Sequence, residues 1–157
     1  MRGSTACRGA RQISCSASKR FDEPEVISRK LIHLPYALYG KRGIKPPRAG
    51  DGSGIRIVTM NAEFADMPDA IWLTRMLPNA EVASRSNNRQ VQAELCAGGG
   101  GLAVLPRPLG DRDRRLVALD IGMTPPGRDT FVGYHRDLRR LARLRALLDL
   151  VIEQLAG

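Results

Sequence analysis

Two hydrophobic periods alternate along the chain, one typical of β-strands and one typical of α-helices. Short apolar runs bounded by glycine or proline predict strands. Between them, apolar residues recur every three or four positions, as they do on one face of a helix. This alternation predicts an α/β fold with a parallel-rich sheet. The predicted strands are residues 26–32, 36–39, 55–60, 81–84, 102–106, 114–122 and 129–135.

The first predicted helix lies within residues 67–78. Pro68 suits its first turn, where a missing N–H group does no harm. Ile71, Trp72 and Met76 share one helical face, which we expect to be buried.

The second predicted helix starts near Ser86, because Ser86 and Asn87 are residue types that cap helices. Val91, Leu95 and Cys96 then form one side of it. A third, longer helix closes the chain. Asp137 is placed to cap this last helix, and arginines occupy the side opposite its apolar stripe. The stripe consists of Leu141, Leu144, Leu148, Val151 and Leu155.

Four consecutive glycines, Gly98–Gly101, follow the second helix and precede an apolar run. A phosphate-binding loop requires the order strand, glycines, helix, so that free N–H groups at the helix start face the anion. The order here is reversed. The glycines therefore predict a helix end on a left-handed residue and not a nucleotide site.

The chain has 157 residues and a formal net charge of +9, with much of the excess in two clusters. The first twenty residues are basic and contain no acid, and we expect residues 1–24 to form a disordered basic tail. The second cluster is interpreted as the solvated face of the last helix. An aromatic content of 4% argues against a base-stacking surface. The clustered arginines of the last helix are Arg136, Arg139, Arg140, Arg143 and Arg145.

Metal, cofactor and membrane chemistry find no support in the sequence. Cys7, Cys15 and Cys96 lack the spacing of metal ligands, and neither His33 nor His135 is near a cysteine in the sequence. Free thiols predict a reducing, cytoplasmic setting. No apolar run reaches the ~18 residues that a membrane span needs.

Catalytic residues are not apparent either. No Gly-x-Ser-x-Gly elbow is present, and no spacing suggests a Ser, His and acid arrangement. Asp66 and Asp69 lie near a helix start, where negative charge suits the helix dipole, and we expect them to be solvated. The sequence therefore predicts a protein that is not an enzyme.

The order of these elements resembles the effector-binding domain of LysR-type transcriptional regulators. The likeness is carried by "EVISRKLIHLPYALYG", by residues 67–106, and by "FVGYHRDLRRLARLRALLDLVIEQL". Its most specific parts are "AELCAGGGGLAVLP" and "YHRDLRRLARLRALLD". Together they cover the chain from about Glu25 to its end.

The resemblance implies a two-lobe fold similar to type 2 periplasmic binding proteins, with a ligand cleft between the lobes. It implies first-lobe strands in residues 25–40, a complete second lobe in 41–128, and a first-lobe return strand and helix in 129–157. The crossovers are expected near 39–40 and 127–130. The first lobe is expected to be partial, and no winged helix-turn-helix domain is recognisable.

The same resemblance implies a small, anionic organic effector and no cofactor. Ser86 and Asn87 are the expected contacts from the second lobe, although Ser86 as a simple helix cap is an equally open reading. Tyr134 and His135 are the expected ligand contacts from the first lobe. For His135, the alternative is a structural hydrogen-bonding role. Pro106 is expected near the cleft rim, or as a strand terminator only.

These observations favour a truncated LysR-type sensor domain that acts alone, as a homodimer, or with a related regulator. Direct DNA binding is not expected of it. Two alternatives stay open: a basic protein that binds nucleic acid non-specifically, with a steep salt dependence, and a non-functional gene fragment.

Overall fold

The computed structural model describes residues 13–16, 20–22 and 24–156, and its chain divides into two compact units. The central unit is Leu34–Gly127. The terminal unit combines the residues up to His33 with Arg128–Gly157. The first boundary falls beside Pro35, earlier than the crossover expected near residues 39–40.

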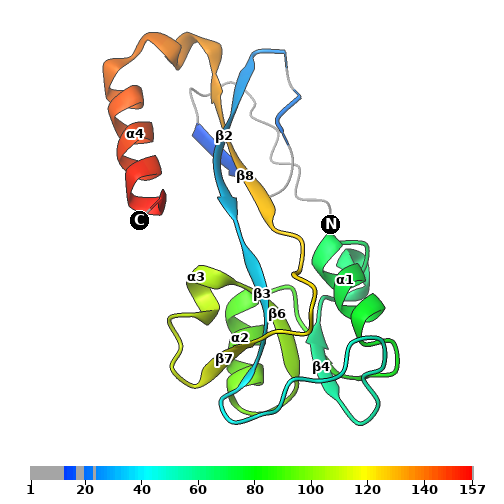
Figure 1. The fold of residues 1–157 in the computed structure, drawn as a ribbon. Helices are drawn as coiled ribbons and strands as arrows, with labels where there is room; N and C mark the ends of the chain where they lie inside the picture. The colour runs from blue at the N-terminus through cyan, green and yellow to red at the C-terminus, as the bar shows by residue number, and fades with distance from the viewer. Residues whose placement is uncertain (1–12, 17–19, 23, 157) are drawn as a thin grey trace. The chain divides into compact units, whose positions relative to one another are not determined.

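A five-stranded sheet forms the centre of the central unit, with the strand order β5-β4-β6-β3-β7 (Figure 1). Strand β4 is parallel to both β5 and β6, whereas β3 is antiparallel to β6 and β7. The five strands and the helices between them confirm the predicted α/β pattern. Residues 36–39, which the family resemblance assigned to the first lobe, lie in the central unit. The strands are β3 (Tyr36–Lys41), β4 (Arg56–Thr59), β5 (Glu81–Arg85), β6 (Leu102–Pro106) and β7 (Leu116–Leu119).

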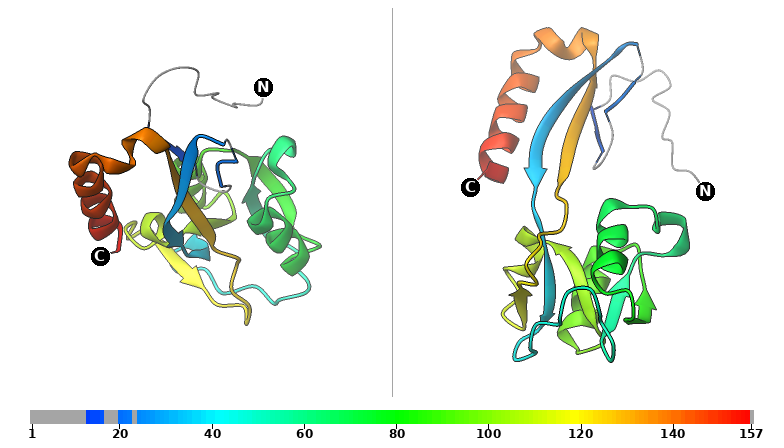
Figure 2. Two further views of the ribbon diagram at one scale, coloured as in Figure 1. Left: turned by 90° about the horizontal axis from the view of Figure 1, so that it is seen from above. Right: turned by 45° about the vertical axis from the view of Figure 1, so that its right-hand side comes forward.

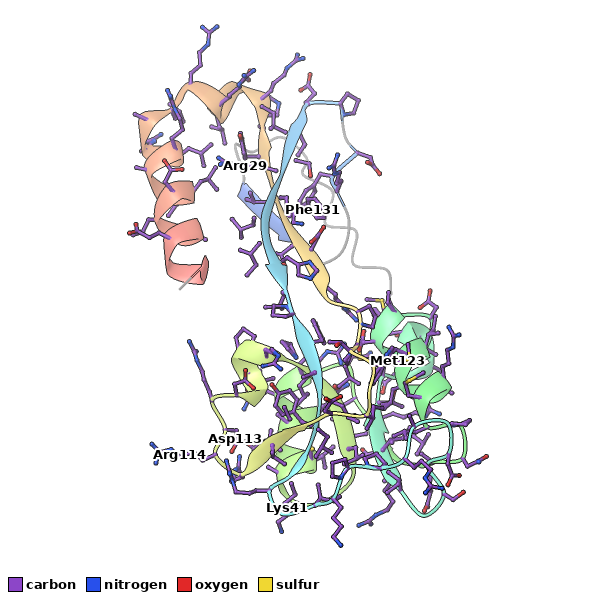
Figure 3. The ribbon with its side chains drawn as sticks, in the orientation of Figure 1. Arg29, Lys41, Asp113, Arg114, Met123 and Phe131 are labelled. Atoms are coloured by element: carbon purple, nitrogen blue, oxygen red, sulfur yellow. The ribbon has the colours of Figure 1, made fainter. Side chains whose placement is uncertain are left out.

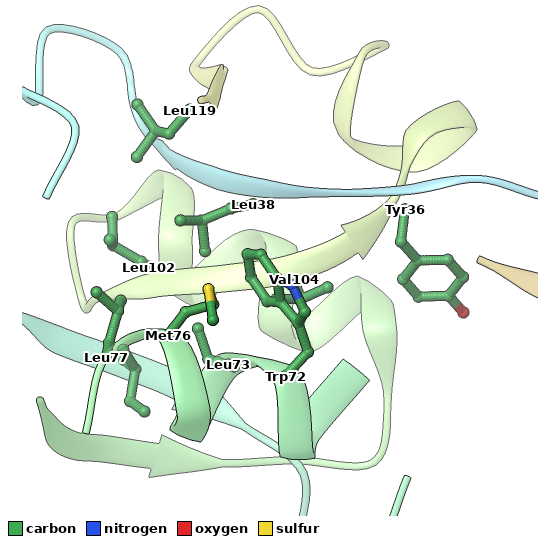
Figure 4. Packing of buried hydrophobic residues seen from close by; sticks show 10 residues of the cluster. Tyr36, Leu38, Trp72, Leu73, Met76, Leu77, Leu102, Val104 and Leu119 are labelled. Carbon is green, nitrogen blue, oxygen red and sulfur yellow. The ribbon is translucent and has the colours of Figure 1, made fainter. Parts of the chain in front are cut away.

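Two helices cover opposite faces of this sheet. Helix α1 (Pro68–Met76) packs against Leu38 and Leu102, whereas α2 (Arg89–Ala97) packs against Tyr39. Neighbouring strand residues point to opposite faces, so one sheet builds two hydrophobic clusters. Figure 4 shows the cluster under α1. The short helices η1 (Ala62–Phe64) and α3 (Arg107–Gly110) complete the unit.

The buried faces of both helices differ in detail from those predicted. Trp72 and Met76 are buried as expected, but Ile71 is 53% exposed. In α2, Val91 is 44% exposed, and small residues such as Ala93 face the sheet instead. Small side chains allow a helix to approach a sheet closely, and this close packing outweighs the larger apolar surface of Val91.

The glycine run ends α2 as the sequence predicted. Gly99 adopts a φ of +85°, the left-handed conformation that favours glycine. Gly101 has a φ of +156°, and a Cβ atom there would lie 2.8 Å from the carbonyl oxygen of Arg56 on β4. The run therefore both stops the helix and lets β6 start against β4.

The terminal unit contains a three-stranded sheet with the order β1-β8-β2, and a long helix beside it (Figures 1 and 2). Its core joins the sheet to the helix through Val132, Tyr134, Leu138, Leu144 and Leu148. This confirms the central part of the predicted apolar stripe. The elements are β1 (Ile13–Ser16), β2 (Val26–Leu34), β8 (Arg128–His135), η2 (Arg136–Arg140) and α4 (Ala142–Ala156).

Two local predictions for this unit need correction. Residues 13–16, assigned to a disordered tail, pair antiparallel with β8, because the strand supplies partners for the backbone groups of that edge. Residues 1–12, 17–19 and 23 of the predicted tail lie outside the described residues. The last helix does not run on from Asp137, because η2 and the extended Leu141 separate α4 from β8.

Candidate functional site

Chemically distinctive residues gather where the parallel strands of the central sheet end. The carboxyl ends of β4, β5 and β6 lie at one edge of the sheet, because these strands run in the same direction. Pairing of Tyr36 with Pro106 brings the start of β3 to the same edge. In open α/β sheets this edge is the usual place for ligand binding. We call the residues Tyr36, Met60, Asn61, Ser86–Asn88 and Pro106 the carboxyl edge.

Ser86 and Asn87 form a loop that is bound to the end of the neighbouring strand. The backbone N–H of Ser86 donates to the carbonyl of Thr59 at 2.9 Å. The side-chain Oδ1 of Asn87 accepts a hydrogen bond from the backbone N–H of Asn61 at 3.0 Å. The loops that follow β4 and β5 are therefore held together.

The residue that caps α2 is Asn88. Its Oδ1 accepts hydrogen bonds from the N–H groups of Gln90 and Val91, at 2.9 and 3.2 Å. The Oγ of Ser86 accepts from the N–H of Asn88, so Ser86 does not cap the helix. Capping by Asn88 already satisfies two of the free N–H groups that a helix start normally presents.

Donors remain at Asn87. Within the part of the chain that the structure describes, neither its backbone N–H nor its side-chain NH₂ group has an acceptor. The exposed side chain is oriented by its Oδ1 contact with Asn61, which leaves the NH₂ group available. The Asn87 amide is therefore a positioned donor on the carboxyl edge.

Arg89 connects the starts of the two helices. Its Nη2 lies 2.6 Å from Oδ2 of Asp69, whose side chain is only 2% exposed. Its Nη1 donates to Oε1 of Gln92 and to the carbonyl of Val104. The guanidinium also lies 5.4 Å from the ring centroid of Tyr36. This ion pair corrects the prediction of a solvated Asp69, whereas Asp66 is exposed as expected.

Gln92 holds the loop that contains Ser86 in place. It is fully buried, and its Nε2 donates to the carbonyl of Ser86. Sequence reasoning missed Asp69, Arg89 and Gln92. The sequence signal that was available for Gln92 is its spacing: it is a polar residue three positions after Arg89, within the helical period. No local pattern connects Arg89 with Asp69, because the two meet only when α1 and α2 pack on the sheet.

A buried donor without a partner lies close to this edge. Trp72 is 8% exposed, and its Nε1 has no hydrogen-bond partner among the described residues. In Figure 4 the indole nitrogen lies on the side of the ring that is nearer to Tyr36. An unsatisfied buried N–H group is unusual in a native protein and calls for an explanation.

The sequence profile of the LysR substrate binding domain matches residues 16–156. The chain belongs to this family. No curated protein sequence matches it. Among solved structures, the LysR-type regulatory domain of CrgA from Neisseria meningitidis superposes with a TM-score of 0.68 at 17% identity, covering 90% of this chain and 74% of that one.

Two further solved structures show the same fold. A structure of a longer CrgA chain from the same organism superposes with a TM-score of 0.73 at 17% identity, covering 92% of this chain and 52% of that one. A reduced form of OxyR from N. meningitidis gives 0.62 at 19% identity, covering 90% and 69%. These likenesses confirm the predicted α/β, periplasmic-binding-protein-like fold.

His135 was also expected, from the family resemblance, to contact the ligand. Both of its ring nitrogens have protein partners. Nδ1 accepts from the backbone N–H of Asp137, which leaves the proton on Nε2 for donation to Glu25 at 2.9 Å. The hydrogen bond from His135, together with nearby Arg136, lowers the pKa of the Glu25 carboxyl. His135 thus starts η2 and fixes the end of β8.

Tyr134 and Pro106 occupy different surroundings. Tyr134 is buried in the core of the terminal unit, next to Leu144 and Leu148. Pro106 ends β6, and the N–H of the next residue, Arg107, donates to the carbonyl of Pro35. The ligand roles of all five predicted residues stay predictions.

Within the described residues, no group of three or more His, Cys, Asp or Glu side chains could hold a metal ion. No helix in the same residues is long and apolar enough to cross a membrane.

Proposed function

We propose that this LysR substrate-binding domain binds a small anionic organic effector at the carboxyl edge of its central sheet. The observation that carries the proposal is the Asn87 amide, which is oriented by its bond to Asn61 and keeps an unused NH₂ group. Amide N–H groups bind carboxylate oxygens through charge-assisted hydrogen bonds.

Two further donors support an anionic ligand at the same edge. The hydroxyl of Ser86 makes only a long contact, 3.5 Å, with the carbonyl of Asn88, so a better acceptor can replace it. The other donor is the unsatisfied Nε1 of Trp72, which is buried on the side of the indole ring nearer to Tyr36. A ligand rich in acceptor oxygens would satisfy the unused donors of Asn87 and Ser86.

Gln92 and Arg89 serve this site as positioning residues. Gln92 holds the backbone of the Ser86 loop, and Arg89 holds Gln92 while its charge is matched by Asp69. The edge is therefore formed before the ligand arrives, which reduces the entropic cost of binding. A ligand that favours one arrangement of a regulator shifts its population toward that arrangement. A cytoplasmic sensor that acts alone or as a homodimer, without catalysis, is consistent with this design.

Thermal unfolding in the presence of a panel of mono- and dicarboxylates tests the proposal. Asn87→Asp keeps the Oδ1 acceptor for Asn61 but removes the donor and introduces negative charge. We expect at least one carboxylate to raise the Tm of the wild type, and Asn87→Asp to abolish the rise. Gln90→Ala, on the neighbouring turn, serves as the control and should respond like the wild type. No rise with a folded wild-type sample contradicts the proposal.

A further inference from the structure

A basic hollow lies within the terminal unit, separate from the carboxyl edge. It has a volume of about 510 Å³, with Leu144 and Leu148 contributing apolar wall. Four guanidinium groups and one phenol complete its lining: Arg29, Arg139, Arg140, Arg145 and Tyr134. We call this the arginine hollow.

Three elements bring these arginines together. Arg139 and Arg140 come from η2, and Arg145 comes from the first turn of α4. Arg29 comes from β2 and lies midway between Ile27 and Leu31, so the three side chains share one face of the strand. Ile27 and Leu31 pack against the core that α4 covers. Figure 3 shows Arg29 on the side of β2 that faces α4.

The charge of the arginine hollow is not neutralised by the protein. In the described part of the chain, none of its four guanidinium groups forms an ion pair or hydrogen bond. Glu25 contacts His135 and Arg136, and Asp129 contacts Lys30, whereas the exposed Asp149 on α4 forms no ion pair with the arginines of the hollow. Like charges that converge on a concave surface repel each other and attract counter-ions. All four arginines are exposed, and one of them comes from the sheet and not from a helix.

A tyrosine hydroxyl adds a neutral hydrogen-bonding group to this charge. Tyr134 is 8% exposed, and its hydroxyl has no hydrogen-bond partner among the described residues. Its position in the lining of the arginine hollow makes it available to a ligand bound there.

We propose that the arginine hollow binds a small phosphorylated metabolite that carries at least two negative charges. Guanidinium groups pair with phosphate oxygens in a bidentate fashion and stay charged at all physiological pH values. The volume is that of a small-molecule site. The concave placement, with one arginine from a strand under a helix, favours a compact ligand over a nucleic-acid backbone, which needs an open stripe of charge.

Isothermal titration of the whole chain with inorganic pyrophosphate tests this site. The double variant Arg29→Gln/Arg145→Gln removes two charges from opposite sides of the arginine hollow. The matched control, Arg48→Gln/Arg75→Gln, removes two exposed arginine charges from the central unit. We expect the first variant to bind pyrophosphate roughly tenfold or more weakly, and the control to bind within about twofold of the wild type. Equal weakening by both variants would show non-specific attraction and overturn the proposal.

Tyr134→Phe separates ligand binding from folding. Because the hydroxyl has no protein partner, its removal should leave the Tm of the free protein unchanged while weakening pyrophosphate binding about threefold to tenfold. Unchanged affinity, or binding of duplex DNA in preference to pyrophosphate, would overturn the proposal. Asn87→Asp should bind pyrophosphate like the wild type, so failure of the carboxylate site and failure of the arginine hollow are distinguishable.

Discussion

Nη2 of Arg89 lies 2.6 Å from Oδ2 of Asp69, and this pair joins the first turns of α1 and α2 across the carboxyl edge of the central sheet. The carboxylate is almost fully buried, with 2% of its side chain exposed. A buried ion pair contributes to stability mainly because loss of one partner leaves the other charge without its match. The pair therefore holds the geometry of the loop that carries Ser86 and Asn87.

Arg89→Gln should destabilise the central unit strongly. Removal of the guanidinium removes the positive charge that pairs with the buried Asp69 carboxylate. It also removes the hydrogen bonds that Arg89 donates to Gln92 and to the carbonyl of Val104. We expect the free energy of unfolding to fall by about 3 kcal/mol. Chemical denaturation followed by tryptophan fluorescence of Trp72 measures it. Arg107→Gln is the control, because the side chains of Arg107 and its partner Asp111 are about half exposed. Its cost should stay below about 1 kcal/mol. Equal costs for the two variants would contradict this role of Arg89.

Two glycines of one run should respond to alanine in opposite ways. At Gly101 the φ of +156° and the 2.8 Å approach to the carbonyl oxygen of Arg56 leave no room for Cβ. Gly101→Ala should cost about 2 kcal/mol or more. Gly98 has a φ of −70°, and its Cβ would make an ordinary contact. Gly98→Ala should be neutral or stabilise by about 0.5 kcal/mol, since it reduces the entropy of the unfolded chain. Equilibrium urea denaturation compares them, and a destabilised Gly98→Ala would count against this assignment.

Acidification should remove a stabilising contribution from the terminal unit. A hydrogen bond from Lys30, and a further one from His33, lower the pKa of Asp129 below the ordinary value of 3.8. A carboxyl whose pKa is lower in the folded state stabilises above its unfolded pKa, and this stabilisation is lost as pH falls through the folded pKa. Asp129→Asn should therefore lower the Tm at pH 7, and the difference from wild type should shrink below about pH 4. A difference independent of pH would exclude this contribution.

The thiol of Cys96 should be inert in the folded protein. Burial raises the pKa of Cys96 to about 11, and its Sγ donates to the carbonyl of Tyr39 at 3.3 Å. Because the thiolate is the reactive form, labelling by a thiol reagent at pH 8 should require unfolding of α2 from the sheet. The variant Cys7→Ser/Cys15→Ser isolates this thiol. Its labelling rate should rise in parallel with the unfolded fraction in urea, whereas fast labelling of the native protein would contradict the prediction.

Local patterns accounted for most elements but not for every face. The apolar run at 102–106 became β6, and the reversed order of helix and glycines correctly excluded a phosphate loop. Ile71 was misplaced because a short helix with apolar residues on several sides does not reveal which side meets the sheet. The cap of α2 fell on Asn88 because Ser86 and Asn87 bind the end of β4 instead.

The sequence by itself determined the alternation of strands and helices, the end of α2 and the family, because each depends on residues that are close together along the chain. Tertiary structure decided which polar groups meet. Arg89 and Asp69 are twenty positions apart, and Arg29 and Arg145 lie near opposite ends of the chain. Their proximity follows from the strand order and from the faces on which α1, α2 and α4 pack, and these are set by long-range burial of apolar surface, which no local period encodes.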